Sequence, residues 1–403
     1  MAEPRSVTVG DRIAMWRGLR GWSQKQLADF SGLSVGFIGM LESGARQLNR
    51  RRDLTAIAEA LQCTPEDLTG EPYGPADEAD ARAYAAIPDL RIALLDSSPE
   101  DPPDVQPRPL ARLVEDLRRA QRAWHAGRYD VFGPLVPRLL EELYVLAADR
   151  DEPSARQALS VLVEASYLAD VLAKGLGHPD LALLASDRAR QAAAMSGDPA
   201  LIGFADWVLI MTLERAGARR RAPKMAAAAV ERMEPHGGDG PETGQVYGML
   251  QLVSGLIAAR FQNPDAAQGH LDEAAALADR LGQGNAYQLH FGPTNVDMWR
   301  VESAVELGEG PRAVELDRDL DPSVVHSPTR EAAYWVVLGR GLAQRDDGGQ
   351  DREAVTMFLR AERLNAQGVR RDPLVREIVA AMARRDRSGN VDLRSLARRL
   401  GQG

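Results

Sequence analysis

Apolar residues recur at spacings of three and four along almost the whole chain, which is the pattern of amphipathic helices. Ala, Leu and Arg supply most of these positions, and these residue types favour helix. Runs of β-branched residues are scarce, and aromatic residues make up 5% of the sequence. The pattern therefore predicts an all-α protein built from many helices.

Turn-forming and proline-rich segments divide these helices into groups. A first unit ends near Gly70, after a threonine, a proline and two acids at 64–67 that suit the start of a short helix. A short helical stretch at 76–95 precedes 97–109, where five prolines favour a semi-rigid linker and a domain boundary. The predicted units are residues 1–70, 71–109, 110–385 and 386–403, the last being a basic tail.

The segment 110–385 shows helices in pairs. Short turns rich in Gly, Pro and Asp separate them, for example at 177–180, 196–199 and 262–265. Repeated helix pairs predict an α-solenoid, in which each pair packs on the next.

Two stretches of this segment resemble tetratricopeptide repeats. One places Trp335, Leu338, Gly339 and Leu342 at the spacing W-x2-L-G-x2-Y, with Leu replacing Tyr, and Ala354, Phe358 and Ala361 on the second helix after about three extra loop residues. A second copy has Gly255, Ala267, Leu271 and Ala274 at the same offsets. The resemblance implies small residues where paired helices approach closely and large ones that fill the space between them.

The segment 9–68 carries a different pattern. Ile13 marks a first helix, Ser23 and Gln26 form a capping box that opens a second, and Gly32 makes a turn before Ser34 caps a third. The residues expected in its core are Leu27, Ala28, Leu33, Ile38, Leu41, Leu54, Ile57, Ala58 and Leu61, with Trp16 and Trp22 beside them.

The stretch SQKQLADFSGLSVGFIGMLESGAR in this segment resembles the helix-turn-helix of the XRE, or phage-repressor-like, family. The resemblance implies a five-helix domain that binds double-stranded DNA, with Val35 to Glu42 as the recognition helix in the major groove. It also implies that Gln24, Arg17 and Arg46 bind phosphates. The residues expected to contact DNA are Arg17, Gln24, Lys25, Ser34, Val35, Gly36, Gly39, Met40, Arg46, Arg50 and Arg51.

The exposed positions of the expected recognition helix are unusual. Val35, Gly36, Gly39 and Met40 cannot form bidentate hydrogen bonds with bases. One interpretation is a close backbone approach with apolar contacts to thymine methyl groups, in which DNA shape supplies specificity. The alternative is a degenerate helix-turn-helix that serves dimerisation or contacts another protein.

Charge distinguishes the first segment from the rest. The chain has 49 basic and 58 acidic residues, a net charge of −9, yet nine bases face three acids between Arg5 and Arg52. This segment carries +6 and the remainder −15, as expected if only the first segment meets phosphates. Arg50, Arg51 and Arg52 start a helix, where cations oppose the helix dipole, so they indicate a phosphate partner rather than an ordinary solvated helix start.

The segment 285–299 gathers polar and aromatic residues around a Phe-Gly-Pro break. Together with the solenoid it resembles the C-terminal part of actinobacterial XRE regulators and, in architecture, the peptide-responsive RRNPP regulators. On that analogy a concave repeat surface binds a short peptide or small-molecule effector. The candidate groove residues are Asn285, Tyr287, His290, Asn295, Trp299 and Trp335. The alternative is that they cap and pack a kinked helix junction.

Other functional classes find little support in the sequence. The six histidines show no metal-ligand spacing, and phosphate-binding loops and nucleophile motifs do not occur, so we expect no enzyme, metal or cofactor. Cys63 is the single cysteine and suits a small core position in a reducing cytoplasm. No run of 18 apolar residues indicates a membrane span. The sequence thus favours a cytoplasmic, homodimeric DNA-binding regulator, with a protein-interaction adaptor as the rival.

Overall fold

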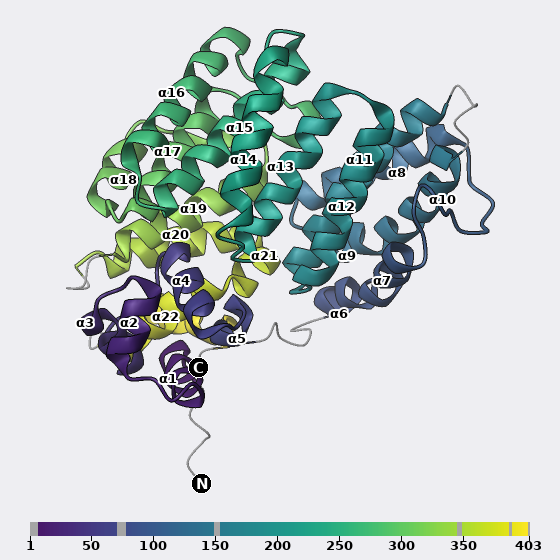
Figure 1. Ribbon diagram of the computed structural model, residues 1–403. Helices are drawn as coiled ribbons and strands as arrows, with labels where there is room; N and C mark the ends of the chain where they lie inside the picture. Colours follow the sequence, from purple (N-terminus) through teal and green to yellow (C-terminus); the bar gives the residue numbers. More distant parts are fainter. Residues whose placement is uncertain (1–6, 71–77, 149–153, 345–348, 387–388, 402–403) are drawn as a thin grey trace.

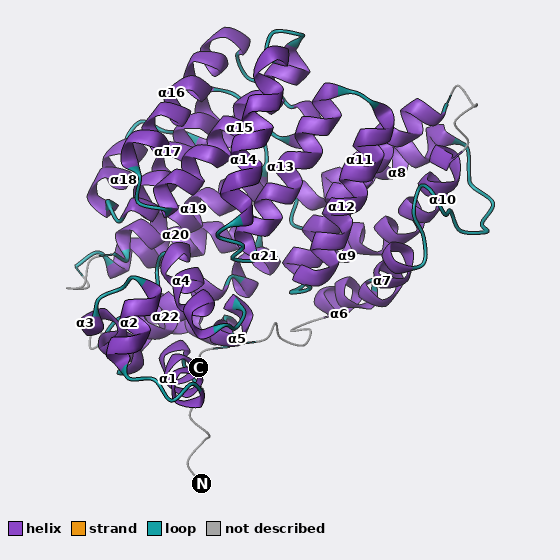
Figure 2. Cartoon of the chain, viewed as in Figure 1, coloured by secondary structure: helices purple, strands orange, loops and turns teal. Residues whose placement is uncertain are grey.

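The computed structural model describes residues 7–70, 78–148, 154–344, 349–386 and 389–401. This part of the chain consists of helices and loops, without a β-strand (Figure 2). The all-α prediction is confirmed. None of the described helices is long and apolar enough to cross a membrane.

The N-terminal domain contains the five expected helices. They are α1 (Val9–Leu19), α2 (Gln24–Ser31), α3 (Val35–Glu42), α4 (Arg51–Leu61) and α5 (Pro65–Thr69). Helix α5 begins as predicted, because Thr64 caps it in a capping box with Asp67 and Pro65 occupies its first turn. The residues expected in the core of this domain are buried, except Leu33, Trp16 and Trp22, which are partly buried against it.

A larger helical body follows (Figure 1). Its helices are α6 (Glu78–Ala85), α7 (Ile87–Leu95), α8 (Leu110–His125), α9 (Tyr129–Phe132), α10 (Val136–Ala148), α11 (Ala155–Gly175), α12 (Pro179–Ser196), α13 (Pro199–Arg215), α14 (Arg221–Met233), α15 (Pro241–Arg260), α16 (Pro264–Leu281), α17 (Pro293–Leu307), α18 (Gly310–Asp317), α19 (Pro328–Leu342), α20 (Asp351–Leu364), α21 (Ala366–Arg371), α22 (Pro373–Arg385) and α23 (Val391–Arg399). Single turns of 3-10 helix are η1 (Gly133–Leu135), η2 (Glu234–His236), η3 (Ala286–Gln288) and η4 (Pro322–Val325). The three turns predicted at 177–180, 196–199 and 262–265 precede α12, α13 and α16, each of which starts with proline.

Consecutive helices of the body pack as antiparallel pairs that stack in a helical-repeat arrangement (Figure 1). The two stretches with repeat-like spacing form the pairs α15 with α16 and α19 with α20. A Cβ atom at Gly339 would lie 2.6 Å from the Phe358 ring, and one at Gly255 would lie 3.2 Å from the carbonyl oxygen of Ala267. These glycines therefore permit the close approach of paired helices that their spacing implies.

Late helices of the body lie against its first helices, so the stack closes on itself. The Thr329 hydroxyl on α19 donates to the carbonyl oxygens of Trp124 and His125 at the end of α8. Gln367 on α21 donates to Asp80 on α6 and accepts from the backbone N–H of Tyr129. Helices about 200 to 290 residues apart in sequence are thereby joined.

The structures of two segments, 97–109 and 386–403, differ in part from what the sequence predicts. Residues 97–109 are loop, as predicted, but Leu90 on one side and Leu113 on the other belong to one hydrophobic core. The loop therefore connects two parts of one core rather than two separate cores. The expected basic tail 386–403 contains α23, because Leu393 and Leu396 alternate with its arginines at helical spacing and are buried against the body.

The N-terminal domain is docked on the body. Its core includes Leu374 from α22. Gln47 donates to the carbonyl oxygen of Ala343 and accepts from Arg385, while Arg340 donates to the carbonyl oxygen of Asn49. In Figure 1, α4 and α5 lie next to the body and α3 lies at the outer edge. The docking thus leaves α3 on the outside of the molecule.

Candidate nucleic-acid interface

Local sequence determines the geometry of α2 and α3. Ser23 and Gln26 form the predicted capping box at the start of α2, and Gly32 ends the helix in the left-handed conformation with φ of 69°. The Ser34 hydroxyl then accepts from the backbone N–H of Phe37 and caps α3. The predicted boundaries of α3, Val35 and Glu42, are confirmed.

The outer face of α3 is accessible and largely apolar. Val35 and Met40 are 45% and 39% exposed, and Ser34 and Gly36 are also exposed. A Cβ atom at Gly36 would meet no other atom within 4 Å. This face can therefore approach a flat or grooved surface closely with its backbone and with apolar side chains.

Gly39 has a different environment from Gly36. A Cβ atom there would lie 3.3 Å from the Oε1 atom of Gln24, so the Gln24 side chain covers this part of α3. Gln24 also donates to Glu42 through Nε2 at 2.8 Å. The absence of a side chain at Gly39 thus allows the Gln24 side chain, from α2, to lie across α3.

Arg17 is part of the same polar cluster. Its Nε and Nη2 atoms donate to the two carboxylate oxygens of Glu42 at 2.6 and 2.8 Å, and Nη1 donates to the carbonyl oxygen of Trp22. Arg17 and Gln24 thus both donate hydrogen bonds that fix α3 on α1 and α2, and the phosphate contacts expected of them stay a prediction. In this structure they join the three helices through charge-assisted hydrogen bonds.

The three arginines at the start of α4 are also placed differently from the prediction. The Nε atoms of Arg50 and Arg52 lie 2.8 and 3.2 Å from the carboxylate oxygens of Asp53, whose side chain is 1% exposed. Burial raises the pKa of Asp53, and the two arginines oppose that rise. Arg50 and Arg52 therefore form ion pairs with a buried acid at the docking interface.

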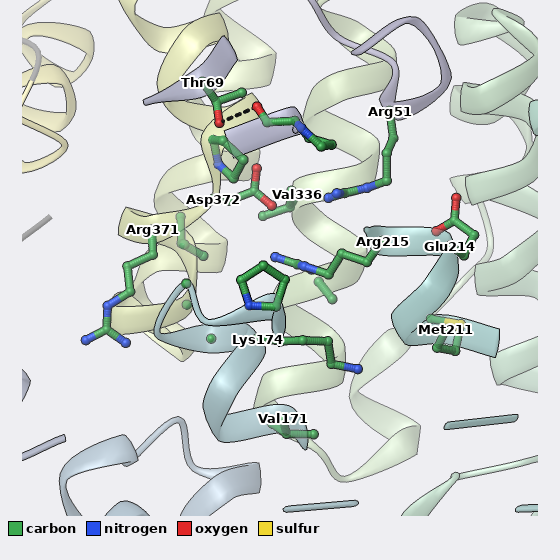
Figure 3. A pocket seen from close by; sticks show the side chains of 18 of the residues that line it. Arg51, Thr69, Val171, Lys174, Met211, Glu214, Arg215, Val336, Arg371 and Asp372 are labelled. Carbon is green, nitrogen blue, oxygen red and sulfur yellow. Dashed lines mark hydrogen bonds between the residues drawn. The ribbon is translucent and has the colours of Figure 1, made fainter. Parts of the chain in front are cut away.

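Arg51 lines a cavity between α4, α5 and the body (Figure 3). It comes from the helix that faces the body, whereas α3 packs on α1 and α2. In this arrangement Arg50 and Arg51 lie on the helix that faces the body, and their expected contact with DNA stays a prediction. A sequence signal for this placement was the acid Asp53, which directly follows the arginines.

Two further residues expected to contact DNA lie on α2 and after α3. Lys25 is exposed in the first turn of α2, and Arg46 follows α3, with its guanidinium carbon 5.1 Å from the centre of the Phe37 ring. Phe30, which the sequence reasoning did not select, is 63% exposed at the end of α2 and contacts Trp22 at a ring distance of 4.6 Å. The candidate interface is therefore α3 with Arg46 beside it, together with Lys25 and Phe30 exposed on α2.

Five of the six expected effector residues do gather around η3. Tyr287 stacks on Phe204 at 4.9 Å, and His290 contacts His125 at 4.8 Å. The buried Asn295 donates to the carbonyl oxygen of Leu289 and accepts from Arg330. Burial first, and then His125, Arg330 and His326, lower the pKa of His290 to about 3.

These contacts are those of a packed junction between α16 and α17. Asn285 accepts from the backbone N–H of His290, and Arg330 lies 5.7 Å from the centre of the buried Trp299 ring. Trp335 is elsewhere, buried on α19 with Arg360 stacked on its ring at 3.7 Å. The structure thus separates Trp335 from the other five residues and agrees with the alternative of a packed, kinked helix junction.

Comparison with known proteins bears on the first domain. A family model described as a helix-turn-helix domain matches residues 8–69. Comparison with curated proteins and with solved structures finds no match to the chain. The family match covers α1 to α5 and ends before the helical body.

Proposed function

We propose that this protein is a cytoplasmic transcriptional regulator of the XRE type, which binds operator DNA through α2 and α3. The observation that carries the proposal is the placement of the domain, which matches a helix-turn-helix family and is docked through α4 and α5 while α3 stays exposed. An exposed second helix of this motif is the element that enters a major groove.

The manner of base recognition follows from the exposed face of α3. Lys25 and Arg46 supply positive charge beside it, and Val35 and Met40 supply apolar contacts of the kind that thymine methyl groups accept. Specificity then comes from close approach, methyl contacts and DNA shape. A domain that recognises DNA in this way gains selectivity by binding two half-sites. We propose that the body holds two copies of the chain together as a dimer.

The body is proposed to be a tetratricopeptide-like sensor. The close contacts of Gly339 and Gly255 with their partner helices support the repeat assignment. A cavity that is lined by both the body and the first domain docked on it supports effector sensing.

The same α3 face favours a second candidate, a protein-interaction adaptor. Val35, Met40 and Phe30 are exposed apolar side chains on one domain, and such residues also suit a contact with another protein.

Selection of genomic DNA fragments by the purified full-length chain distinguishes the two functions. A regulator enriches a motif with two half-sites about one helical turn apart, whereas an adaptor enriches none. The enriched duplex then serves for anisotropy titrations. Binding that is equally tight to any duplex would contradict sequence-specific regulation.

A further inference from the structure

The docked first domain and the inner helices of the body line a cavity of about 400 Å³ that is open to solvent on one side, where Arg215 is exposed. Its wall includes residues of α4 and α5 on one side and of α11, α13, α15, α19 and α22 on the others. A volume of this size lies within the range of small-molecule sites. Because both parts of the protein contribute to the wall, a bound molecule would contact both.

The wall combines apolar and cationic groups. Apolar side chains include Trp124, Val171, Met211 and Val336. Cationic side chains on the wall are Arg51, Lys174, Arg215, Arg260, Arg340, Arg371 and Arg376, and acidic ones are Glu66, Glu214, Glu302 and Asp372. The composition suits an organic molecule with a negatively charged group.

Several of the cations already have acidic partners. Lys174 lies 2.5 Å from Asp170, and Arg340 lies 2.7 Å from the buried Glu306. Arg260 pairs with Glu214 and Glu306, and Arg371 lies 2.5 Å from Asp80. These groups are part of the framework of the wall.

Arg51 and Arg215 differ from these cations. Within the described part of the chain, neither of them forms an ion pair with a carboxylate. Figure 3 shows both guanidinium groups directed into the same space, one from α4 and one from the end of α13, with Asp372 beyond them. Asp372 is already engaged, because its carboxylate accepts from the backbone N–H groups of Leu374 and Val375.

The two guanidinium groups repel each other. Burial first, and then the neighbouring Arg215, lower the pKa of Arg51 to about 10, while Asp372 and Glu214 oppose part of the change. Arg51 thus stays charged at neutral pH beside a second cation. An anion between them would remove this repulsion and gain charge-assisted hydrogen bonds from both sides.

We propose that this cavity is a binding site for a small organic anion, a phosphate or a carboxylate, held between Arg51 of the first domain and Arg215 of the body. The anion strengthens the docking of α4 and α5 on the body, since it contacts both. An effect of the anion on DNA binding rests on the proposed function, whereas the binding of the anion to the cavity does not.

Thermal unfolding of the full-length chain tests the site, with sodium pyrophosphate and sodium citrate as the two probes and sodium chloride at equal ionic strength as reference. We expect at least one probe to raise Tm by about 2 °C or more over chloride. Pyrophosphate alone indicates a phosphate ligand, and citrate alone indicates a carboxylate. The shift should disappear in Arg51→Gln and Arg215→Gln and persist in Arg220→Gln, an exposed arginine outside the cavity.

The variants without a probe give a second measurement. Because Arg215→Gln removes a like charge next to Arg51, its Tm should equal or exceed that of the wild type. Hydrogen exchange of the α4 and α5 amides should slow when the probe binds to the wild type. No shift over chloride with either probe, or an equal shift in all variants, overturns the proposal. Selection of DNA fragments is a separate measurement, so failure of the proposed function would be recognised independently.

Discussion

Arg17 donates two hydrogen bonds to Glu42 and thereby joins the first helix of the N-terminal domain to the last turn of α3. Their side chains are 20% and 8% exposed. Burial alone would raise the pKa of Glu42, but hydrogen bonds from Arg17 and Gln24 lower it. The pair is therefore formed with Glu42 ionised.

Replacing Glu42 with alanine should destabilise the first domain by about 2 kcal/mol, because it leaves the Arg17 and Gln24 donors without their acceptor. Hydrogen exchange of the amides in α1 to α3 measures this directly. Asp29→Asn, at an exposed position of α2, serves as control. An unchanged exchange rate in Glu42→Ala would show that the pair contributes nothing.

Lys25→Ala should weaken DNA binding severalfold for all sequences and lower the slope of log affinity against log salt by about 1, because it removes one phosphate contact. Anisotropy titrations at several salt concentrations provide the slope. Lys224→Ala, an exposed lysine on α14, is the matched control. Equal slopes for the two variants would remove Lys25 from the interface.

Gly36→Gln should change the preferred DNA sequence without loss of stability, since a side chain there enters open space and replaces the least helix-favouring residue except proline. Selection of DNA fragments and urea unfolding check the two parts. Gly10→Ala is the contrasting variant. A Cβ atom at Gly10 would lie 2.1 Å from the carbonyl oxygen of Leu41, and we expect a loss of about 2 kcal/mol or more. Identical motifs for Gly36→Gln and the wild type would speak against α3 as the reading element.

Glu377 gives the docking interface a dependence on pH. Burial raises the pKa of this α22 carboxyl from 4.5 to about 7, although Arg384 and Arg12 oppose the rise and Asp11 adds to it. The folded state thus holds the proton more tightly than the unfolded state. The stability contribution of the protonated group is present below pH 4.5 and is lost as pH rises to 7.

Glu377→Gln should consequently be more stable than the wild type at pH 8, by an amount on the order of 2 kcal/mol, and similar to it at pH 4.5. Urea unfolding at both pH values measures the difference. Glu315→Gln, exposed on α18, should change neither value. A gain that is the same at both pH values would contradict titration of Glu377.

Gly339→Val tests the pairing of α19 with α20. Its side chain would overlap the Phe358 ring, so we expect a loss of about 2 kcal/mol or more in urea unfolding. Gly238→Ala, where a Cβ atom meets nothing, should lie within about 0.5 kcal/mol of the wild type. Tolerance of valine at 339 would mean that the helices can separate without cost.

The sequence was most informative where the cause of structure is local. The capping box at Ser23 and the left-handed turn at Gly32 depend on neighbouring residues, so their spacing predicted α2 and α3 correctly. The all-α class followed from the same kind of periodicity.

The site residues were harder to predict because their partners are distant in sequence. Arg17 finds Glu42 across 25 positions, and Arg51 faces Arg215 only after the body has folded. A basic cluster predicts a phosphate partner when no acid in the fold neutralises its charge, and here Asp53 pairs with Arg50 and Arg52. Trp335 was recognised by its spacing within a repeat motif. That spacing describes only its own helix pair, so it could not show that Trp335 lies apart from His290 and the other expected groove residues.

The contacts of Thr329 and Gln367 with α8, α6 and α9 affect how the chain can be made. Helices α6, α8 and α9 are synthesised long before α19 and α21. Their surfaces that contact α19 and α21 therefore stay exposed to solvent until these later helices have been made. The core of the N-terminal domain is completed later still, because it includes Leu374 from α22. We therefore expect that the N-terminal domain completes its core only after α22 has been synthesised, although its own helices precede those of the body in sequence.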